Sequence, residues 1–456
     1  MKKNHWVWRL VLIGLTVAMS TLGIGFSFAT AATGNTESPA LRIGLMTKQF
    51  SVLASSNGNY EISNADDGKV LGEYAPGVKV RIGLREGKFV INNTVVDAER
   101  LRIAQKSAHM ERDDRLLDIN NRRYRGAVEI FRTQGATGMT AVNILPVEEY
   151  VYGVLTKILL PEWPEQAIKA QAVTLRTFAL YNLGKHANEG FDLCDNADCQ
   201  LYEGQVGEDA RILKAVKDTR GMVMLHQGYL IAAYSHLSGG GYTENSENVF
   251  GKAYPYLRGV LDTDQTSPYF RWQKKISPSE LDGLLKGAGY NIGTLMAIEL
   301  SKRTPAPIDS PDRGVSGRIK TITFIGKDGI VALSGEKTRE LLSLQSTLFD
   351  ISVGVPLANI DSNITDSFGD RDAKQIQINL PPASTGGLLT DRPGIHRFSG
   401  QKNEILFIDG SGWGHGVGLS QWGAKTLAEK AINPAADYYI SILKHYFQGV
   451  TIDKWY

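Results

Sequence analysis

Hydrophobic and polar positions divide the chain into a β-rich first part and a more helical middle. Between residues 41 and 135, short apolar runs with partial alternation are separated by clusters of Gly, Asn and Asp. Alternation of this kind between turn residues is typical of β-strands. The runs are LRIGLM, VKVRIGL, FVINN and GAVEIFR. We therefore predict an antiparallel, β-rich module over residues 40–140.

The stretch PEQAIKAQAVTLRTFALYNL, residues 164–183, predicts a helix. It is rich in strong helix formers, and Pro164 suits a first helical position because its missing N–H is not needed there. Apolar residues recur at i, i+4, i+7 and i+11, which places them on one buried face. These residues are Ile168, Ala172, Leu175 and Ala179. A second helix is expected in DARILKAVKDTRG, ending at Gly221.

The rest of the chain mixes strands and helices. Strands are predicted in MVMLHQ, LIAAYSHL, RIKTITFIG, GIVALSG and EILFIDG, and helices near TRELLSL and ADYYISILKHYFQG. No steady βαβ rhythm is present, which favours an α+β fold with mixed, mostly antiparallel strands around a central helical region. We expect a groove-forming core at 141–375, an exposed Pro/Gly/Ser-rich loop at 376–400, and a last part at 401–456 that completes the core.

The N-terminus predicts export. Lys2 and Lys3 precede an apolar run over residues 10–28, and small residues follow at 29–31. A basic start, an apolar middle and an A-x-A site describe a secretory signal peptide over residues 1–31. The alternative is an uncleaved anchor, because the run is nearly long enough to span a bilayer. The protein is therefore expected outside the cytoplasm, and at the membrane only if this segment is retained.

Charge argues against a nucleic-acid partner. The 456 residues carry a formal net charge of only +2, so there is no strong electrostatic attraction to nucleic acid. Glycine is the unusual component, with 48 residues concentrated in particular stretches.

The two cysteines, Cys194 and Cys199, lie close together in FDLCDNADCQLYEG. Outside the cytoplasm, two nearby cysteines most simply form a disulfide, and that is our prediction. The alternative is a metal site, with zinc held by both thiolates and by His186 or Asp198. With no second C-x-x-C pair, we expect neither a metal nor another cofactor.

The stretch GSGWGHGVGLSQWGA, residues 410–424, has glycine at every even position from 410 to 418. If it is extended, one face is bare backbone, open to another backbone or to a flat ligand. Trp413 and Trp422 could then stack on a sugar ring, and His415 could bind or transfer a proton. The alternative is that the strand packs tightly on its own domain and His415 is structural. The residues sharing the opposite face would be Ser411, Trp413, His415, Val417 and Leu419.

A second candidate site is SHLSGGGYTENSENVFG, residues 235–251. Three glycines precede polar groups suited to hydroxyls and amides, and the absence of Lys and Arg argues against phosphate. The alternative is a long surface loop with polar tips. The candidate ligand contacts here are Ser238, Tyr242, Thr243 and Glu244.

Several motifs in order resemble the stage II sporulation protein D/amidase-enhancer family (SpoIID/LytB). They are LPVEEYVYGVL, WPEQAIKAQAVTLRTFAL, CDNADCQLYEG, SGGGYTENSENVF, YPYLRGV, SGEKTRELLSLQSTLF and GWGHGVGLSQWGA. The resemblance implies a protein that acts on bacterial cell-wall glycan. Sporulation members of the family look like lytic transglycosylases that cut peptide-stripped glycan strands, and other members modify a wall amidase. Ser420 and Gln421, in the last motif, would then contact glycan.

This chain lacks the two glutamates that the resemblance to the family leads us to expect. Members usually carry one Glu in a stretch like E-M-P and another in E-A-L-K-A-Q, of which we take the second as the acid. The aligned residues here are Ile158 and Gln166. An amide cannot exchange a proton near neutral pH, so cleavage would need Glu165 or Glu162 instead. Two hypotheses follow: an active lytic transglycosylase, or a catalytically silent glycan-binding modifier of a wall amidase.

Overall fold

The computed structural model describes residues 37–106, 114–159, 162–207, 209–355, 393–401 and 403–456. The predicted signal peptide and most of the predicted 376–400 loop lie outside the described residues. Within the described ranges, no helix is both long enough and apolar enough to cross a membrane. Helices and strands are interspersed in mixed, open sheets, which confirms the predicted α+β class.

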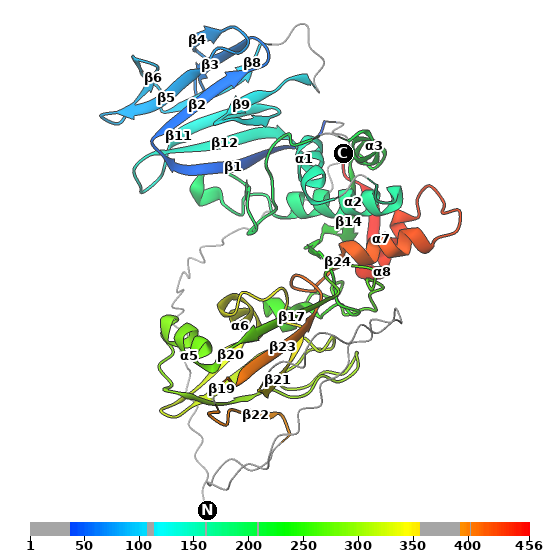
Figure 1. Cartoon of the computed structure of the whole chain (residues 1–456). Coiled ribbons are helices and arrows are strands. Elements are labelled where there is room, and N and C mark those ends of the chain that lie inside the picture. Colours follow the sequence, from blue (N-terminus) through cyan, green and yellow to red (C-terminus); the bar gives the residue numbers. More distant parts are fainter. Residues whose placement is uncertain (1–36, 107–113, 160–161, 208, 356–392, 402) are drawn as a thin grey trace, which may run out of the picture.

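The N-terminal part is built from two sheets, drawn in blue and cyan in Figure 1. Neighbouring strands run antiparallel, apart from β1 and β13, which run parallel. One sheet has the order β13 (Leu193–Cys194), β1 (Ala40–Gln49), β12 (Met139–Pro146), β11 (Ala127–Arg132), β8 (Arg100–Gln105), β3 (Tyr60–Asn64), β4 (Val70–Tyr74). The other has the order β10 (Arg122–Tyr124), β9 (Leu117–Ile119), β2 (Ser51–Ser56), β5 (Val80–Arg85), β6 (Lys88–Ile91), β7 (Thr94–Val96).

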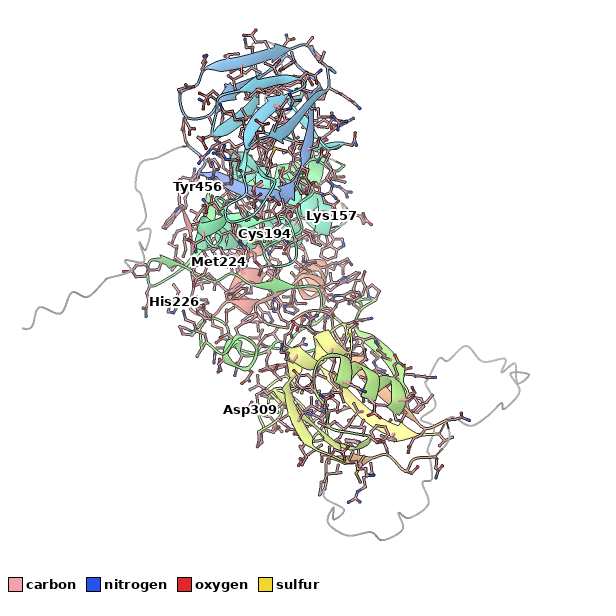
Figure 2. All side chains as sticks on the ribbon, turned by 90° about the vertical axis from the view of Figure 1, so that its left-hand side faces the viewer. Lys157, Cys194, Met224, His226, Asp309 and Tyr456 are labelled. Carbon is pink, nitrogen blue, oxygen red and sulfur yellow. The ribbon has the colours of Figure 1, made fainter. Side chains whose placement is uncertain are left out.

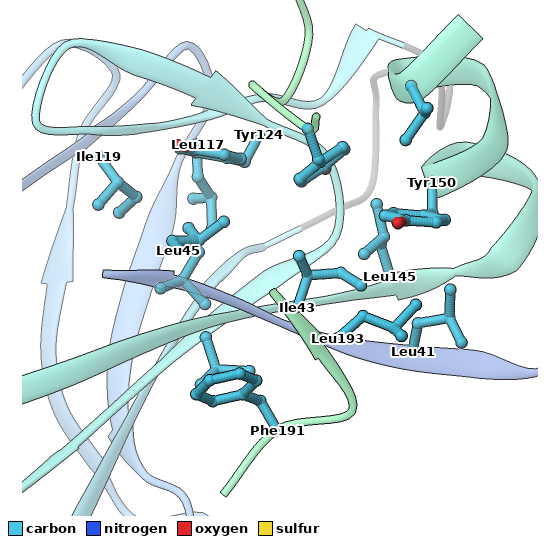
Figure 3. Close-up of a cluster of buried hydrophobic side chains, with 14 of the residues drawn as sticks. Leu41, Ile43, Leu45, Leu117, Ile119, Tyr124, Leu145, Tyr150, Phe191 and Leu193 are labelled. Atoms are coloured by element: carbon cyan, nitrogen blue, oxygen red, sulfur yellow. The ribbon is translucent and has the colours of Figure 1, made fainter. Parts of the chain in front are cut away.

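Apolar residues at every second position of β1 form part of the hydrophobic core of this N-terminal part. Leu41, Ile43 and Leu45 are buried, and they belong to the same cluster as Leu145 and Leu193 from neighbouring strands (Figure 3). Side chains two residues apart on a strand point to the same face, so this spacing delivers three apolar side chains to one core. The cluster continues into the helical part of the molecule.

Helix α2 (Glu165–Tyr181) is the centre of that helical part and confirms the predicted helix. Every residue from Gln166 to Leu180 is buried. The predicted apolar face joins the cluster under the N-terminal sheets, while Ala167, Ala170 and Val173 join a second cluster. The surrounding elements are α1 (Val147–Ile158), α3 (Ala210–Asp218), α7 (Gln421–Lys430), α8 (Tyr439–Tyr446), β14 (Met222–His226), β15 (Tyr229–Leu230) and β25 (Thr451–Lys454).

A buried ion pair ties these helices together. Arg176 of α2 is fully buried, and its guanidinium binds both carboxylate oxygens of Glu148 on α1, with distances of 3.0 and 2.6 Å. The same carboxylate accepts hydrogen bonds from the Gly221 N–H and the Tyr456 hydroxyl. One acid therefore joins α1, α2, the turn after α3 and Tyr456, which follows the strand over residues 451–454.

The remaining sheets surround a third cluster of buried residues, drawn at the bottom of Figure 1. The predicted strands over residues 321–334 and 405–411 and the helix near residue 338 are present. The strands are β17 (Arg271–Ile276), β23 (Ile405–Ser411) and β21 (Phe349–Gly354) in one sheet, and β20 (Ile330–Ser334), β19 (Thr321–Gly326), β18 (Leu295–Glu299) and β22 (Ile395–Arg397) in the other. The helices are α5 (Pro278–Gly287) and α6 (Gly335–Leu341). The chain returns from β23 to α7 through the glycine-rich stretch.

Short elements connect these parts and border the site. They are η2 (Ala187–Glu189), β16 (Ser235–His236), α4 (Ser246–Phe250) and β24 (Leu419–Ser420). The predicted strand over LIAAYSHL is mostly wrong, because only β15 at its start and β16 near its end have strand geometry. β16 pairs with β24 in parallel, which brings the two glycine-containing motifs side by side.

Candidate functional site

The glycine-rich stretch is not an extended strand, contrary to the prediction. Four of its glycines have φ between +73° and +98°, in the left-handed region that only glycine adopts freely. The side chains between them therefore do not share one face: Trp413 is 40% exposed, whereas Val417 and Leu419 are fully buried. The four glycines are Gly412, Gly414, Gly416 and Gly418.

Other atoms of the protein occupy the space where side chains at these glycines would stand. A Cβ on Gly416 would lie 2.0 Å from Nε of Arg318, and one on Gly418 would lie 2.2 Å from the carbonyl oxygen of Tyr234. A Cβ on Gly412 would lie 2.7 Å from the carbonyl oxygen of Ser238. Glycine is required here because the chain packs against Arg318 and against its own 234–240 segment, which agrees with the alternative interpretation of a strand packed on its own domain.

A cavity of about 370 Å³ opens beside this stretch. Its size lies in the range of small-molecule sites. It is bounded by the end of α1, by the loop that follows Cys194, by the segment around β16 and by the start of α7. The lining residues are Ile158, Phe178, 197–201, 234–237, Phe250, His415 and Gln421.

His415 is one of two neutral histidines at this cavity. Its Nδ1 accepts a hydrogen bond from the Val417 N–H at 3.0 Å. Burial, and then the nearby Arg318 cation, lower the pKa of His415 to about 4. His236 lies beside it, with ring centroids 5.5 Å apart, and burial lowers its pKa well below the usual range. At neutral pH both rings carry no charge.

The residues predicted in the 235–251 loop are mostly used inside the protein. The Ser238 hydroxyl donates to the Asp264 carboxylate, and the Thr243 hydroxyl accepts from the Val260 N–H at 2.8 Å. Glu244 is fully buried. Its carboxylate accepts hydrogen bonds from the backbone of residues 315 and 316. These side chains, together with Tyr242, are not among the described residues that line the cavity.

Of the remaining predicted glycan contacts, Trp413, Trp422 and Ser420 contact other parts of the protein, and only Gln421 lines the cavity. Trp413 packs edge-on against Tyr269, with ring centroids 4.8 Å apart, and keeps part of its ring exposed. Trp422 packs against Trp163 at 5.4 Å. The Ser420 hydroxyl accepts a hydrogen bond from the Gly423 N–H and so caps the N-terminus of α7. Gln421, the next residue, lines the cavity.

Comparisons with known proteins identify the family. Residues 135–226 match the family described as Stage II sporulation protein (SpoIID). An uncharacterized protein of Brachyspira hyodysenteriae is 30% identical over 69% of this chain and 68% of its own length. The chain belongs to the SpoIID family. Two named relatives are each 26% identical: the amidase enhancer of Bacillus subtilis, over 84% of this chain and 51% of its own length, and stage II sporulation protein D of Bacillus amyloliquefaciens, over 76% and 85%.

The resemblance aligns Ile158 and Gln166 with the two family Glu residues, and the structure gives these two side chains different surroundings. Ile158, at the first position, lines the cavity. Gln166, at the second, is buried against the start of α8 instead. Its Oε1 accepts from the Tyr439 N–H at 3.0 Å, and its Nε2 donates to the Ala436 carbonyl at 3.3 Å. The amide is suited to this place because it can both accept and donate, which a carboxylate cannot.

The substitute acids, Glu165 and Glu162, are not among the described residues at the cavity. Glu165 forms ion pairs with Lys169 at 2.7 Å and Lys214 at 3.1 Å. The hydrogen bond from Lys169 is the main reason why the pKa of Glu165 is lowered. A carboxylate held in this way stays ionised and is poorly suited to donate a proton. Glu162 is exposed.

The predicted disulfide is wrong, because Cys194 and Cys199 are both free thiols. Cys194 is labelled in the middle part of the molecule in Figure 2. The Cys199 sulfur instead accepts a hydrogen bond from the Cys194 N–H at 3.0 Å. Ligand atoms of His186, Cys194, Asp198 and Cys199 all lie within 4.8 Å of one another. Two thiolates, an imidazole and a carboxylate are a donor set that fits tetrahedral zinc.

This cysteine cluster borders the cavity, since Asp198 and Cys199 also line it. Sequence reasoning missed the role of His236 and Phe250 as cavity residues, although both stood in a quoted motif. Their side-chain directions depend on the pairing of β16 with β24, which the sequence pattern does not specify.

Proposed function

We propose that this protein is an exported cell-wall protein that holds glycan strands at the cavity beside His415 without cutting them. In this account it assists a wall amidase rather than acting as a lytic transglycosylase. The amidase link is suggested by the relative named amidase enhancer.

The observation that supports the proposal most directly is the presence of Ile158 at the cavity. It stands where SpoIID proteins usually carry a Glu, and in this chain that position faces the cavity. A lytic transglycosylase needs one acid that protonates the glycosidic oxygen and then takes a proton from the 6-hydroxyl of the sugar. An isoleucine can do neither, and loss of general acid–base catalysis costs roughly 10²–10⁴ in rate.

The one carboxylate among the described cavity residues is Asp198. Its carboxylate forms an ion pair with Lys185 at 3.0 Å and lies 3.1 Å from Nε2 of His186. The hydrogen bond from Lys185 is the main cause of its lowered pKa. Asp198 is therefore ionised at neutral pH, and it does not replace the missing acid.

Glycan is the ligand class that the surroundings favour. The two histidines at the cavity are neutral, and sugar rings are bound mainly through hydrogen bonds and apolar contact. Phe250 lines the cavity, and Trp413, two residues before His415, keeps part of its indole exposed next to Tyr269. Aromatic faces of this kind bury the apolar face of a sugar.

The cluster of His186, Cys194, Asp198 and Cys199 would hold a zinc ion as part of the same proposal. Bound there, zinc would cross-link residues 186 and 199. The chain's own contribution is to hold the 197–201 loop in place as one wall of the cavity.

Co-sedimentation with insoluble, peptide-stripped glycan strands tests binding. We expect the protein to pellet with the strands and a Phe250→Ala variant to pellet much less. Tyr229→Ala is the matched control, because Tyr229 is an exposed aromatic residue outside the cavity lining. Equal recovery of all three proteins in the supernatant would refute the proposal.

A further inference from the structure

A hollow on the outer face of the N-terminal part combines two arginines with a highly exposed phenylalanine. It measures about 210 Å³ and lies over β5, next to the start of β2. None of its lining residues belongs to the cavity beside His415, so it is a separate feature of the surface. The lining residues are Phe50, Ser51, Arg81, Gly83, Leu84, Arg85, Val90 and Asn92.

Strand β5 places both arginines on its outer face. Ile82 is fully buried, so alternation along the strand turns Arg81, Gly83 and Arg85 to the outside. Gly83 pairs with Val90 of β6 and has no side chain of its own, which leaves space between the two arginines. On an extended strand, residues four apart are separated by roughly 13 Å, enough to admit a small anionic group between two long side chains.

The hollow is positively charged. No acidic side chain lines it in the part of the chain that the structure describes. The guanidinium of Arg81 donates only to the Ser51 hydroxyl, over 3.4 Å. The turn after Arg85 adds one acid, Glu86, and one base, Lys88, both exposed, so three basic residues and one acidic residue leave two net positive charges. Guanidinium groups are well suited to phosphate oxygens.

Phe50 adds an apolar group to this charged hollow. It stands between β1 and β2 and is 75% exposed. A Cβ on Gly83 would lie 3.6 Å from the Phe50 carbonyl oxygen, which places the backbone of Phe50 directly beside the hollow. Exposed aromatic side chains next to basic ones are typical of surfaces that lie on anionic lipid, because the ring enters the interface while the cations meet the phosphates.

We propose that Phe50, Arg81 and Arg85, together the Phe50 patch, bind the folded protein to the surface of an anionic membrane. A soluble phosphate polymer would offer the arginines the same anions but would give the phenyl ring no apolar partner. The predicted signal peptide would bring the chain to a membrane during export. Figure 1 shows β5 and β6 on the side of the N-terminal part away from α7 and α8, so this contact leaves the cavity beside His415 accessible.

Vesicle co-sedimentation tests the proposal. The chain from residue 32 onward, which keeps every described residue and lacks the predicted signal peptide, is mixed with vesicles of phosphatidylcholine, alone or with an equal amount of phosphatidylglycerol. We expect binding to the anionic vesicles only, weakening as salt is raised. Arg81→Gln combined with Arg85→Gln should weaken binding roughly 25-fold, about fivefold for each lost cation, and Phe50→Ala roughly tenfold.

Matched changes elsewhere on the surface are the controls. Lys286→Gln combined with Lys327→Gln removes the same charge from two exposed positions, and Ile330→Ala shortens an apolar side chain that is 69% exposed. Both should bind as the wild type does. Amide exchange of β5 and β6 in the wild type should slow when anionic vesicles are added, a readout that needs no variant.

Three outcomes would overturn the proposal. They are equal binding to neutral and anionic vesicles, equal binding by the patch and control variants, and retention on immobilised polyphosphate without vesicle binding, which would assign the arginines to a phosphate polymer. The inference does not depend on glycan binding beside His415, which co-sedimentation with strands tests separately.

Discussion

Replacing Gln166 by Glu is expected to destabilise the protein rather than to activate it. The side chain is 8% exposed, and its amide bridges the backbone of Tyr439 and Ala436. A carboxylate keeps the bond from the Tyr439 N–H but turns an oxygen toward the Ala436 carbonyl oxygen, where the amide donates over 3.3 Å. A lost hydrogen bond and a buried acceptor without a donor together cost about 2–3 kcal/mol.

The cost should depend on pH in a defined direction. Burial and the facing carbonyl raise the folded-state pKa of the introduced carboxyl above its unfolded value of about 4.3. Below the unfolded-state pKa, the carboxyl is protonated in both the folded and the unfolded state. It can then donate a hydrogen bond to the Ala436 carbonyl, so the variant loses little stability. As pH rises the unfolded state releases its proton first, so the stability of the variant falls. Gln166→Met, which removes both hydrogen bonds, should be destabilised equally at every pH.

Urea unfolding at pH 4 and pH 7.5, with amide hydrogen exchange of Tyr439 as a local probe, measures this. We expect the Glu variant to match the wild type closely at pH 4 and to lose about 2–3 kcal/mol at pH 7.5. Glycan cleavage should not appear at either pH. A Glu variant that is as stable as the wild type at pH 7.5, or equally destabilised at both pH values, would refute the structural role given to Gln166.

Three further outcomes are expected. Asp262 has a pKa raised to about 7, by burial and then by Asp264. The folded state therefore holds a proton that the unfolded state releases, and stability should fall by about 3 kcal/mol between pH 4 and 7. Asp262→Asn should remove that fall in pH-dependent urea unfolding. Gly416→Ala should lower stability by at least about 2 kcal/mol, because φ is +78° and the new Cβ meets Arg318; calorimetry checks this. Cys199→Ser should lower the zinc retained after dialysis, measured by mass spectrometry of the metal, and unchanged zinc content would contradict the cluster.

The regular elements could be predicted because their patterns are local. Helix α2 follows from the 3.6-residue repeat of Ile168, Ala172, Leu175 and Ala179, and β1 from its alternating apolar residues. The same reasoning failed at the glycine-rich stretch. Alternation there reflects contacts with Arg318 and Tyr234, which are distant in sequence, and not a strand with a bare face.

The site was only partly predictable for a related reason. His415, Gln421 and Ile158 were identified from motifs, but which of the candidate side chains face one cavity depends on tertiary pairing. Gln166 looked like a disarmed acid and instead holds the start of α8. The cysteines looked like a disulfide, because the pattern alone does not show that His186 and Asp198 bring their ligand atoms to the same place.

The central claim is that the cavity binds glycan but lacks an acid, and mass spectrometry of digestion products tests it most directly. Peptide-free strands are incubated with the wild type, with Ile158→Glu and with Gln166→Glu. We expect no 1,6-anhydro sugar products from the wild type or from Gln166→Glu, and detectable products from Ile158→Glu, which returns a carboxyl to the cavity. Release of 1,6-anhydro products by the wild type would contradict the account.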